Sequence, residues 1–206
     1  MRTAVIGGTF DPVHLGHMHL LHHLIELTDF DRVLMVPVAN PPHKKHEHTV
    51  STQDRIRMLH LALDEYPSLY PDDRKVDILV ELCEIERGGT SYMFDTVAEL
   101  YRMYDIEGRI GMVVGDDLLS GLRRWYRFEE LRHEVEFIIC RRSPVRPPQI
   151  LPPGVEGRFL ENPVMEDSST HIRSLLAEGK VEYSHLASLM PKSVVHYIQD
   201  YGLYSD

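Results

Sequence analysis

The sequence predicts an α/β fold in which a parallel β-sheet is doubly wound, with helices on both of its faces. Short runs of mostly apolar residues, typical of strands buried on both faces, alternate with helical stretches along the chain. The 206 residues are enough for one well-cored domain, whereas two halves would each be small. Crossovers between parallel strands are expected to be right-handed. In such sheets ligands bind at the carboxyl ends of the strands, near the point where strand order reverses, so functional residues are expected there.

The individual elements follow from the spacing of apolar residues. Strands are expected over six apolar ranges: 3–6, 32–36, 77–83, 109–114, 134–140 and 157–160. Helices are expected over five ranges: 17–28, 52–66, 92–104, 170–177 and 192–201. Ser51 or Thr52 can cap the second of these helices. The Pro-rich range 141–157 has no helical period and is expected to be an exposed loop within the domain.

The composition restricts the compartments and the classes of partner that can be expected for this protein. Hydrophobic residues make up 43% of the chain, yet no apolar run reaches the ~20 residues that a membrane helix requires. The first residues enter a strand without a signal-peptide pattern, so a cytoplasmic protein is expected. Cys83 and Cys140 lie in apolar runs and are expected to be buried thiols, not a disulfide. The net charge of −10 disfavours nucleic acid as a partner but leaves small phosphorylated ligands open.

The strongest local signal is the string GGTFDPVHLGH, which includes the end of the first expected strand. Gly7 and Gly8 permit positive φ and a close approach of backbone to a ligand. The helix expected from His17 presents free N–H groups in its first turn, and these favour phosphate. His14 and His17, three residues apart across Gly16, can face the same phosphate. A structural strand-to-helix turn with incidental histidines is the alternative interpretation of the glycine pair taken alone.

The string GTFDPVHLGH resembles the signature of the nucleotidyltransferase superfamily, whose T/HxGH motif corresponds to His14-Leu15-Gly16-His17. Six later segments are similar to those of the bacterial nicotinate-nucleotide adenylyltransferases: VPVANPPHKK, GGTSYMFDTVAEL, VVGDDLLSGLRRWYRFEEL, IICRRSP, DSSTHIRSLLAEGK and LMPKSVVHYIQDYGLY. The resemblance covers about residues 3–204. Met93 and Asp167 depart from the family's pattern and the range 67–76 is long, but none of these differences removes a group that the chemistry requires.

This resemblance implies a Rossmann-like sheet of the nucleotidyltransferase type. It implies a single domain over 1–206, with the C-terminal helices from about 168 to 206 completing the active site. In the implied reaction, the 5′-phosphate of nicotinate mononucleotide attacks the α-phosphorus of ATP, giving deamido-NAD and pyrophosphate, a step of NAD biosynthesis. Both reactants are anions, so alignment and charge neutralisation are required and a protein nucleophile is not. Mg²⁺ is expected, bound through the ATP phosphates.

The resemblance also assigns residues to the two substrates. The residues implied as catalytic are His14, His17, Lys44 and Arg173. Those implied to bind ATP are Gly7, Gly8, Thr9, Phe10, His14, Gly16, His17, Gly115, Asp117, Arg141, Ser169, Thr170 and Arg173. Those implied to bind nicotinate mononucleotide are Gly8, Thr9, Lys44, Tyr92, Met93, Asp117, Trp125 and Tyr126. Ser169, Thr170 and Arg173 are assigned to the β- and γ-phosphates. Asp117 is assigned to the ribose, and Arg141 to the adenine.

Trp125, the only tryptophan, is expected to stack on the nicotinate ring. The alternative interpretation makes Trp125 an aromatic of the core. Tyr126 and the backbone of Met93 are expected near the nicotinate carboxylate. Asp11 is a weaker site candidate, whose role can be simply to shape the loop before Pro12.

Several alternatives stay open at this point. The chain can be an adenylyltransferase for nicotinamide mononucleotide, or one with dual specificity. Phosphopantetheine enzymes share only the first motif, and a catalytically silent regulator would be expected to lose His17, Lys44 or Arg173, all of which are present. A zinc site on His43, His46 and His48 is disfavoured, because three histidines on one polar loop lack a defined geometry. Monomer and homo-oligomer are both compatible with the sequence.

Overall fold

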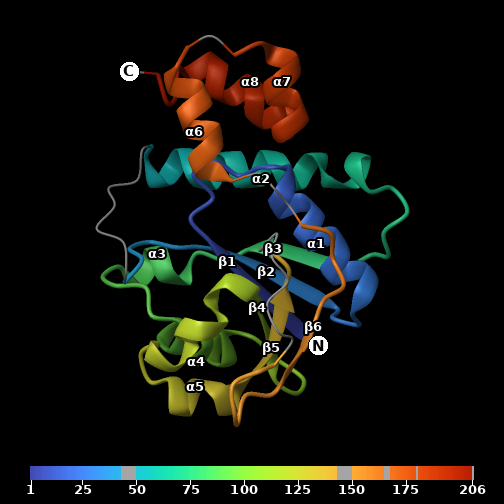
Figure 1. Ribbon diagram of the computed structural model, residues 1–206, viewed down its shortest axis with the longest axis vertical. Coiled ribbons are helices and arrows are strands. Elements are labelled where there is room, and N and C mark those ends of the chain that lie inside the picture. Colours follow the sequence, from blue (N-terminus) through green and yellow to red (C-terminus); the bar gives the residue numbers. More distant parts are fainter. Residues whose placement is uncertain (43–49, 143–149, 165–167, 180, 206) are drawn as a thin grey trace. The chain divides into compact units, whose positions relative to one another are not determined.

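The computed structural model describes residues 1–42, 50–142, 150–164, 168–179 and 181–205. Within these limits the chain forms two compact units (Figure 1). The first unit comprises Met1–Gly8, His23–His46 and Lys75–Met165. The second unit comprises Thr9–His22, Glu47–Arg74 and Glu166–Asp206.

The first unit contains the sheet. Its described strands are β1 (Thr3–Gly8), β2 (Arg32–Pro37), β3 (Asp77–Val80), β4 (Ile110–Gly115), β5 (Val135–Cys140) and β6 (Gly157–Phe159). They pair in the order β3-β2-β1-β4-β5-β6, and every pair is parallel (Figure 1). Strand order therefore reverses between β1 and β4, where Val5 lies opposite both Leu34 and Met112. The predicted α/β parallel sheet is confirmed.

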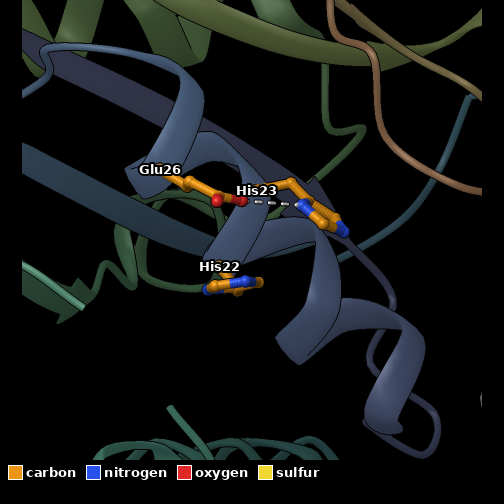
Figure 2. A group of neighbouring side chains, drawn as sticks. All are labelled: His22, His23 and Glu26. Carbon is orange, nitrogen blue, oxygen red and sulfur yellow. Dashed lines mark hydrogen bonds and ion pairs between the residues drawn. The ribbon is translucent and has the colours of Figure 1, made fainter. Parts of the chain in front are cut away.

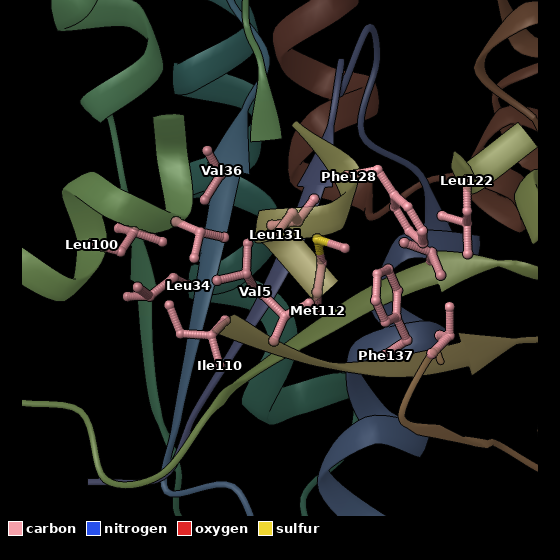
Figure 3. Close-up of a cluster of buried hydrophobic side chains, with 14 of the residues drawn as sticks. Val5, Leu34, Val36, Leu100, Ile110, Met112, Leu122, Phe128, Leu131 and Phe137 are labelled. Carbon is pink, nitrogen blue, oxygen red and sulfur yellow. The ribbon is translucent and has the colours of Figure 1, made fainter. Parts of the chain in front are cut away.

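Both faces of this sheet are buried. One face carries the cluster drawn in Figure 3, in which Val5, Met112 and Phe137 from the strands pack with side chains from helical segments. Among these segments are α4 (Met93–Met103), which contributes Leu100, and α5 (Phe128–Glu134), which contributes Leu131. Residues of the opposite face are equally inaccessible and include Ala4, Ile6, Val33, Met35 and Ile138. Strands buried on both faces are near-continuous apolar runs in the sequence, which explains why their positions could be predicted from it.

The remaining helices differ in how well the sequence predicts them. The expected ones are α1 (Leu15–Leu27), α2 (Thr52–Leu69), α6 (Ser169–Ala177) and α8 (Lys192–Tyr201), together with α4. The helical segments that were not expected are α3 (Cys83–Arg87), the 3₁₀ helix η1 (Asp116–Arg124), α5 and α7 (Tyr183–Leu189). The unexpected segments are mostly too short to show a clear apolar period.

The third strand ends earlier than the predicted range 77–83. It stops at Val80, because the carboxylate of Glu81 accepts the amide of Cys83, two residues further along the chain, at 2.8 Å. The hydroxyl of Tyr104 donates to the other oxygen of Glu81. A side chain that bonds its own backbone competes with the strand ladder, and α3 begins there instead. Cys83 and Cys140 are both buried and free, as expected.

The second unit is built on α2. Ser51 caps this helix, since its hydroxyl accepts the amide of Asp54 at 3.1 Å. Glu65 of α2 accepts the amides of Lys192 and Ser193 at 3.1 and 2.9 Å and the Ser193 hydroxyl at 2.6 Å. A carboxylate of α2 thus satisfies the first N–H groups of α8. Partial burial acts to raise the pKa of Glu65, but the bonds from Ser193 and Lys192 outweigh it and lower the pKa.

We expect Glu65→Gln to reduce the free energy of unfolding by about 1 kcal/mol at neutral pH, the usual value of a helix cap. A lowered folded pKa adds stability above the unfolded pKa of about 4.3, and this stability is lost as pH falls through the folded value. The difference between wild type and Glu65→Gln in urea unfolding should therefore shrink in acid. Asp64→Asn, at an exposed neighbour, is the control. A difference that stays constant between pH 7 and pH 3 would contradict this role.

Candidate functional site

The two histidines of the motif lie together in the second unit. The first turn of α1 closes with the amide of His17 donating to the carbonyl of His14 at 2.9 Å. The amide of His14 donates to Nδ1 of His17 at 3.2 Å, and the ring centroids are 3.9 Å apart. Because Nδ1 of His17 accepts this bond, the proton of the neutral ring is on Nε2. His14 is 6% exposed.

Helix α6 holds the loop that precedes these histidines. The helix begins at Ser169, and the hydroxyl of Ser168 caps it by accepting the amide of His171 at 3.2 Å. Ser169 and Thr170 therefore occupy the first helical positions, as expected. The Ser169 hydroxyl donates to the carbonyl of Pro12 at 3.0 Å. A helix N-terminus combines free N–H groups with a partial positive charge, which suits an anion.

Arg173 reaches the same loop from the next turn of α6. Its Nη1 donates to the carbonyl of Asp11 at 2.5 Å, and its Nη2 donates to the Thr170 hydroxyl at 3.3 Å. The structure thus brings together the motif loop and the predicted cluster of Ser169, Thr170 and Arg173. A guanidinium has five N–H donors, so these two bonds leave donors for a phosphate.

Two residues that the sequence analysis missed support this loop from its buried side. Arg55 of α2 is 0% exposed, and its Nη1 donates to the carbonyl of Thr9 at 2.6 Å. Tyr204, which follows α8, donates its hydroxyl to Oδ1 of Asp11 at 2.8 Å. Burial lowers the pKa of Arg55, while the nearby charge of Asp11 raises it. Burial raises the pKa of Tyr204, and Asp11 raises it further.

A signal for Arg55 was present in the sequence. Met58, Leu59, Ala62 and Tyr66 form the buried face of α2, and Arg55 continues their helical spacing. A charged residue in a core register indicates a buried, paired group. No comparable signal marks Tyr204.

In the first unit, the end of β4 is shaped by Gly115. A Cβ at this position would lie 2.1 Å from Oδ1 of Asp117 and 2.6 Å from Cδ of Arg142, so a larger residue would require both side chains to move. Asp116 is buried and accepts the amide of Arg142 at 3.0 Å. Asp117 is exposed. Gly115 and Asp117, both predicted for ATP, are therefore in direct contact.

Arg141, which follows β5, is held by a residue that the sequence analysis missed. Asn162 is 5% exposed, and its Oδ1 accepts the amide of Arg141 at 2.8 Å while its Nδ2 donates to the carbonyl of Arg141 at 3.0 Å. One side chain thus satisfies both backbone groups of Arg141. This clamp fixes where the Arg141 side chain leaves the sheet edge.

A third group of predicted residues lies at the ends of β1 and β2. The carbonyl of Gly8 accepts the amide of Val38 at 2.9 Å. The hydroxyl of Ser91 accepts the amides of Ala39 and Asn40 at 3.1 and 3.2 Å, which ties the loop after β2 to the start of α4. A Cβ on Gly7 would lie 3.4 Å from the Cε methyl of Met93.

The aromatic residues predicted for the pyridine ring differ in their surroundings. The rings of Tyr92 and Tyr126 are 4.4 Å apart and tilted by 32°. Trp125 is partly buried and packs against the core cluster of the first unit. Its amide donates to the carbonyl of Leu122 at 3.0 Å, where η1 ends. Lys44, the remaining predicted residue, lies outside the described residues, as do His43, His46 and His48.

His22, His23 and Glu26 are neighbours on α1 and together resemble a metal-ligand set (Figure 2). Nδ1 of His23 lies 3.4 Å from Oε2 of Glu26, and Nδ1 of His22 lies 2.8 Å from Oδ1 of Asp73. His22 is therefore bonded to a carboxylate outside the set, and hydrogen bonds account for the way these side chains gather.

Across the described part of the chain, no helix has the length and apolarity needed to cross a membrane.

Comparison with known proteins gives consistent results. Residues 5–175 match the protein family described as cytidylyltransferase-like. A probable nicotinate-nucleotide adenylyltransferase from Treponema pallidum (strain Nichols) is 35% identical over 218 residues, covering 99% of each protein. One from Borreliella burgdorferi is 32% identical over 205 residues, covering 99% of this chain and 97% of that protein.

A solved structure extends the comparison to the fold. The nicotinic acid mononucleotide adenylyltransferase of Plasmodium falciparum, complexed with NaAD, aligns with a TM-score of 0.76. The alignment covers 98% of this chain and 97% of that one at 19% identity, so it concerns the fold.

We expect Asn162→Ala to lower the free energy of unfolding by about 1–3 kcal/mol, because it leaves the partly buried backbone groups of Arg141 without this partner. The side-chain Nδ2 of Asn40 also donates to a carbonyl, that of Gly89, but Asn40 is exposed, so Asn40→Ala is the control. Urea unfolding of the two variants measures the difference. Equal effects of both substitutions would show that the clamp on Arg141 is not needed.

Proposed function

The chain belongs to the cytidylyltransferase-like family and, within it, to the nicotinate-nucleotide adenylyltransferases, and we propose that it carries out adenylyl transfer in NAD biosynthesis. The 5′-phosphate oxygen of nicotinate mononucleotide forms a bond to the α-phosphorus of ATP. The bond from the α-phosphorus to the oxygen bridging to the β-phosphate breaks, and pyrophosphate leaves with its electron pair. The observation that carries this proposal is the facing pair His14 and His17, on a loop held by α6 and Arg173.

The histidine pair acts at the α-phosphate. Nε2–H of His17 donates to an α-phosphoryl oxygen, because Nδ1 is occupied by the amide of His14. His14 contacts the same phosphate chain, and the first N–H groups of α1, around Gly16, add further donors. Donors fixed before the reaction stabilise the charge that builds up in the transition state without reorganising.

The leaving pyrophosphate is held by α6. Ser169 and Thr170 supply hydroxyl and backbone donors at the helix N-terminus, and Arg173 supplies a guanidinium already oriented by Asp11 and Thr170. Lys44 adds a point charge that neutralises phosphate. The segment from about 168 to 206 therefore belongs to the proposed active site.

The remaining parts of the two nucleotides are assigned to residues that the family resemblance implies. Asp117 accepts from ribose hydroxyl groups, and Gly115 permits the close approach. Arg141, clamped by Asn162, stacks on the adenine. Nicotinate stacks on Trp125.

The recognition of the nicotinate carboxylate uses Tyr126 and the backbone of Met93, with Tyr92 beside them.

Cys83 and Cys140 are buried and free, which agrees with a reducing compartment such as the expected cytoplasm.

The side chains at this site agree with an Mg²⁺ ion that is held by the ATP phosphates and not by the protein. The loop supplies nitrogen donors and cations, and its Asp11 carboxylate already accepts from Tyr204. Mg²⁺ prefers oxygen ligands and keeps several waters, so ATP phosphates would hold it. When bound, it neutralises charge on the leaving pyrophosphate.

The direct test is pyrophosphate release by the purified protein with ATP, Mg²⁺ and either nicotinate or nicotinamide mononucleotide. We expect release with the acid, and a loss of at least about a hundredfold in kcat for His17→Ala, because one transition-state donor is removed. His60→Ala, at an exposed position of α2, should leave the rate unchanged. Equal release with both mononucleotides would indicate dual specificity, and no release with either would contradict the proposal.

Removal of the metal gives an independent prediction. Addition of EDTA in excess over Mg²⁺ should abolish pyrophosphate release, and fresh Mg²⁺ should restore it. Calorimetry should detect no Mg²⁺ binding to the protein alone, since the ion enters with ATP. Full activity in EDTA would show that the phosphates are neutralised by protein side chains only.

A further inference from the structure

The loop after β1 contains a residue in an unfavourable conformation. Phe10 has φ of 48°, in the left-handed region, and is 0% exposed. A bulky residue rarely adopts this region, and it persists there only where surrounding contacts determine the conformation. Phe10 lies between Thr9 and Asp11, inside the proposed phosphate loop, and its ring packs edge-on against His17 with centroids 5.0 Å apart.

Phe10 is held through contacts that other side chains make to both of its neighbours in the chain. Arg55 donates to the carbonyl of Thr9, which belongs to the peptide group preceding Phe10. Tyr204 donates to the side chain of Asp11, the residue that follows Phe10. Arg55 and Asp11 are at most 5% exposed. One donor thus holds the backbone that precedes the left-handed residue, and the other holds the side chain of the residue that follows it.

The charges of these groups also matter for an anionic ligand. A carboxylate such as Asp11 beside a phosphate loop repels the ligand unless its charge is offset. The buried guanidinium of Arg55 supplies the opposite charge, and its interaction with Asp11 is attractive. The Tyr204 hydroxyl and this charge together keep Asp11 turned into the unit.

We infer that Arg55 and Tyr204 are positioning residues for adenylyl transfer, which hold Phe10 and Asp11 so that the loop meets the ATP phosphates in one fixed shape. Neither residue touches substrate in this account. Arg55 acts through the Thr9 carbonyl, and Tyr204 acts through the Asp11 carboxylate. The inference rests on the proposed function, because it needs ATP phosphates at this loop.

Tyr204→Phe tests the inference with the smallest change, since it removes only the hydroxyl. We expect kcat/KM for ATP to fall about tenfold through a rise in KM for ATP, because the loop spends less time in the shape that binds ATP. KM for nicotinate mononucleotide should stay unchanged. Tyr201→Phe, at an exposed ring three residues earlier, is the matched control and should behave as wild type.

A merely structural role predicts a different pattern. Loss of folded protein would lower the apparent kcat and the melting temperature while leaving KM for both substrates unchanged. An unchanged kcat/KM for ATP, or a loss confined to melting temperature and kcat, would therefore overturn the inference.

Arg55→Lys is the second variant, because it keeps the charge but replaces the planar fork by a point donor. It should lower kcat/KM for ATP, and the double variant Arg55→Lys, Tyr204→Phe should lose less than the product of the single losses, since both residues hold one loop. Strictly multiplicative losses would contradict a shared role.

A binding measurement separates this inference from the proposed function. Calorimetry with Mg²⁺ and a non-hydrolysable ATP analogue does not depend on turnover. Binding about tenfold weaker in Tyr204→Phe than in Tyr201→Phe supports the inference even if wild type releases no pyrophosphate with nicotinate mononucleotide. Equal binding by the two variants, with normal turnover in wild type, would refute the positioning role and leave the proposed function intact.

Discussion

Four consecutive residues, Thr9 to Pro12, are held by side chains from three distant segments, and the proposed chemistry depends on this constraint. Arg55 of α2 binds the first carbonyl, Arg173 and Ser169 of α6 bind the last two, and Tyr204 binds the carboxylate between them. A loop has no ladder of backbone bonds to stiffen it, so its shape must come from such contacts. The donors that the loop then presents need no reorganisation when charge develops on a phosphate.

In the first unit, we propose that the strand ends let a nucleotide approach the backbone closely. The strand order of this unit reverses between β1 and β4, and in parallel sheets ligands bind beside such a point. Gly7 and Gly8 end β1, and Gly115 ends β4, where a side chain would collide with Asp117 and Arg142. Buried polar side chains, Asp116 and Asn162, then fix the backbone that leaves the neighbouring strand. In each unit, buried side chains form hydrogen bonds that fix the backbone from which the more exposed side chains extend.

The sequence predicted the sheet because buried parallel strands are apolar without interruption, and it predicted the motif residues because GTFDPVHLGH resembles a specific signature. It could not predict the early end of β3, which depends on Glu81 accepting a bond from the amide of Cys83. It assigned no role to Arg55, although the spacing of the buried face of α2 includes it. The bond from Tyr204 to Asp11 joins residues 193 positions apart, and no local pattern encodes such a contact.

We expect the loop from Thr9 to Pro12 to have its productive shape before ATP arrives. Backbone ¹⁵N relaxation of the ligand-free protein measures this directly at Phe10 and Asp11. Order parameters of about 0.85 are expected at both amides, equal to those of a rigid backbone. Values below about 0.6 at these two residues would contradict it, because they would show a flexible loop that ATP itself must organise.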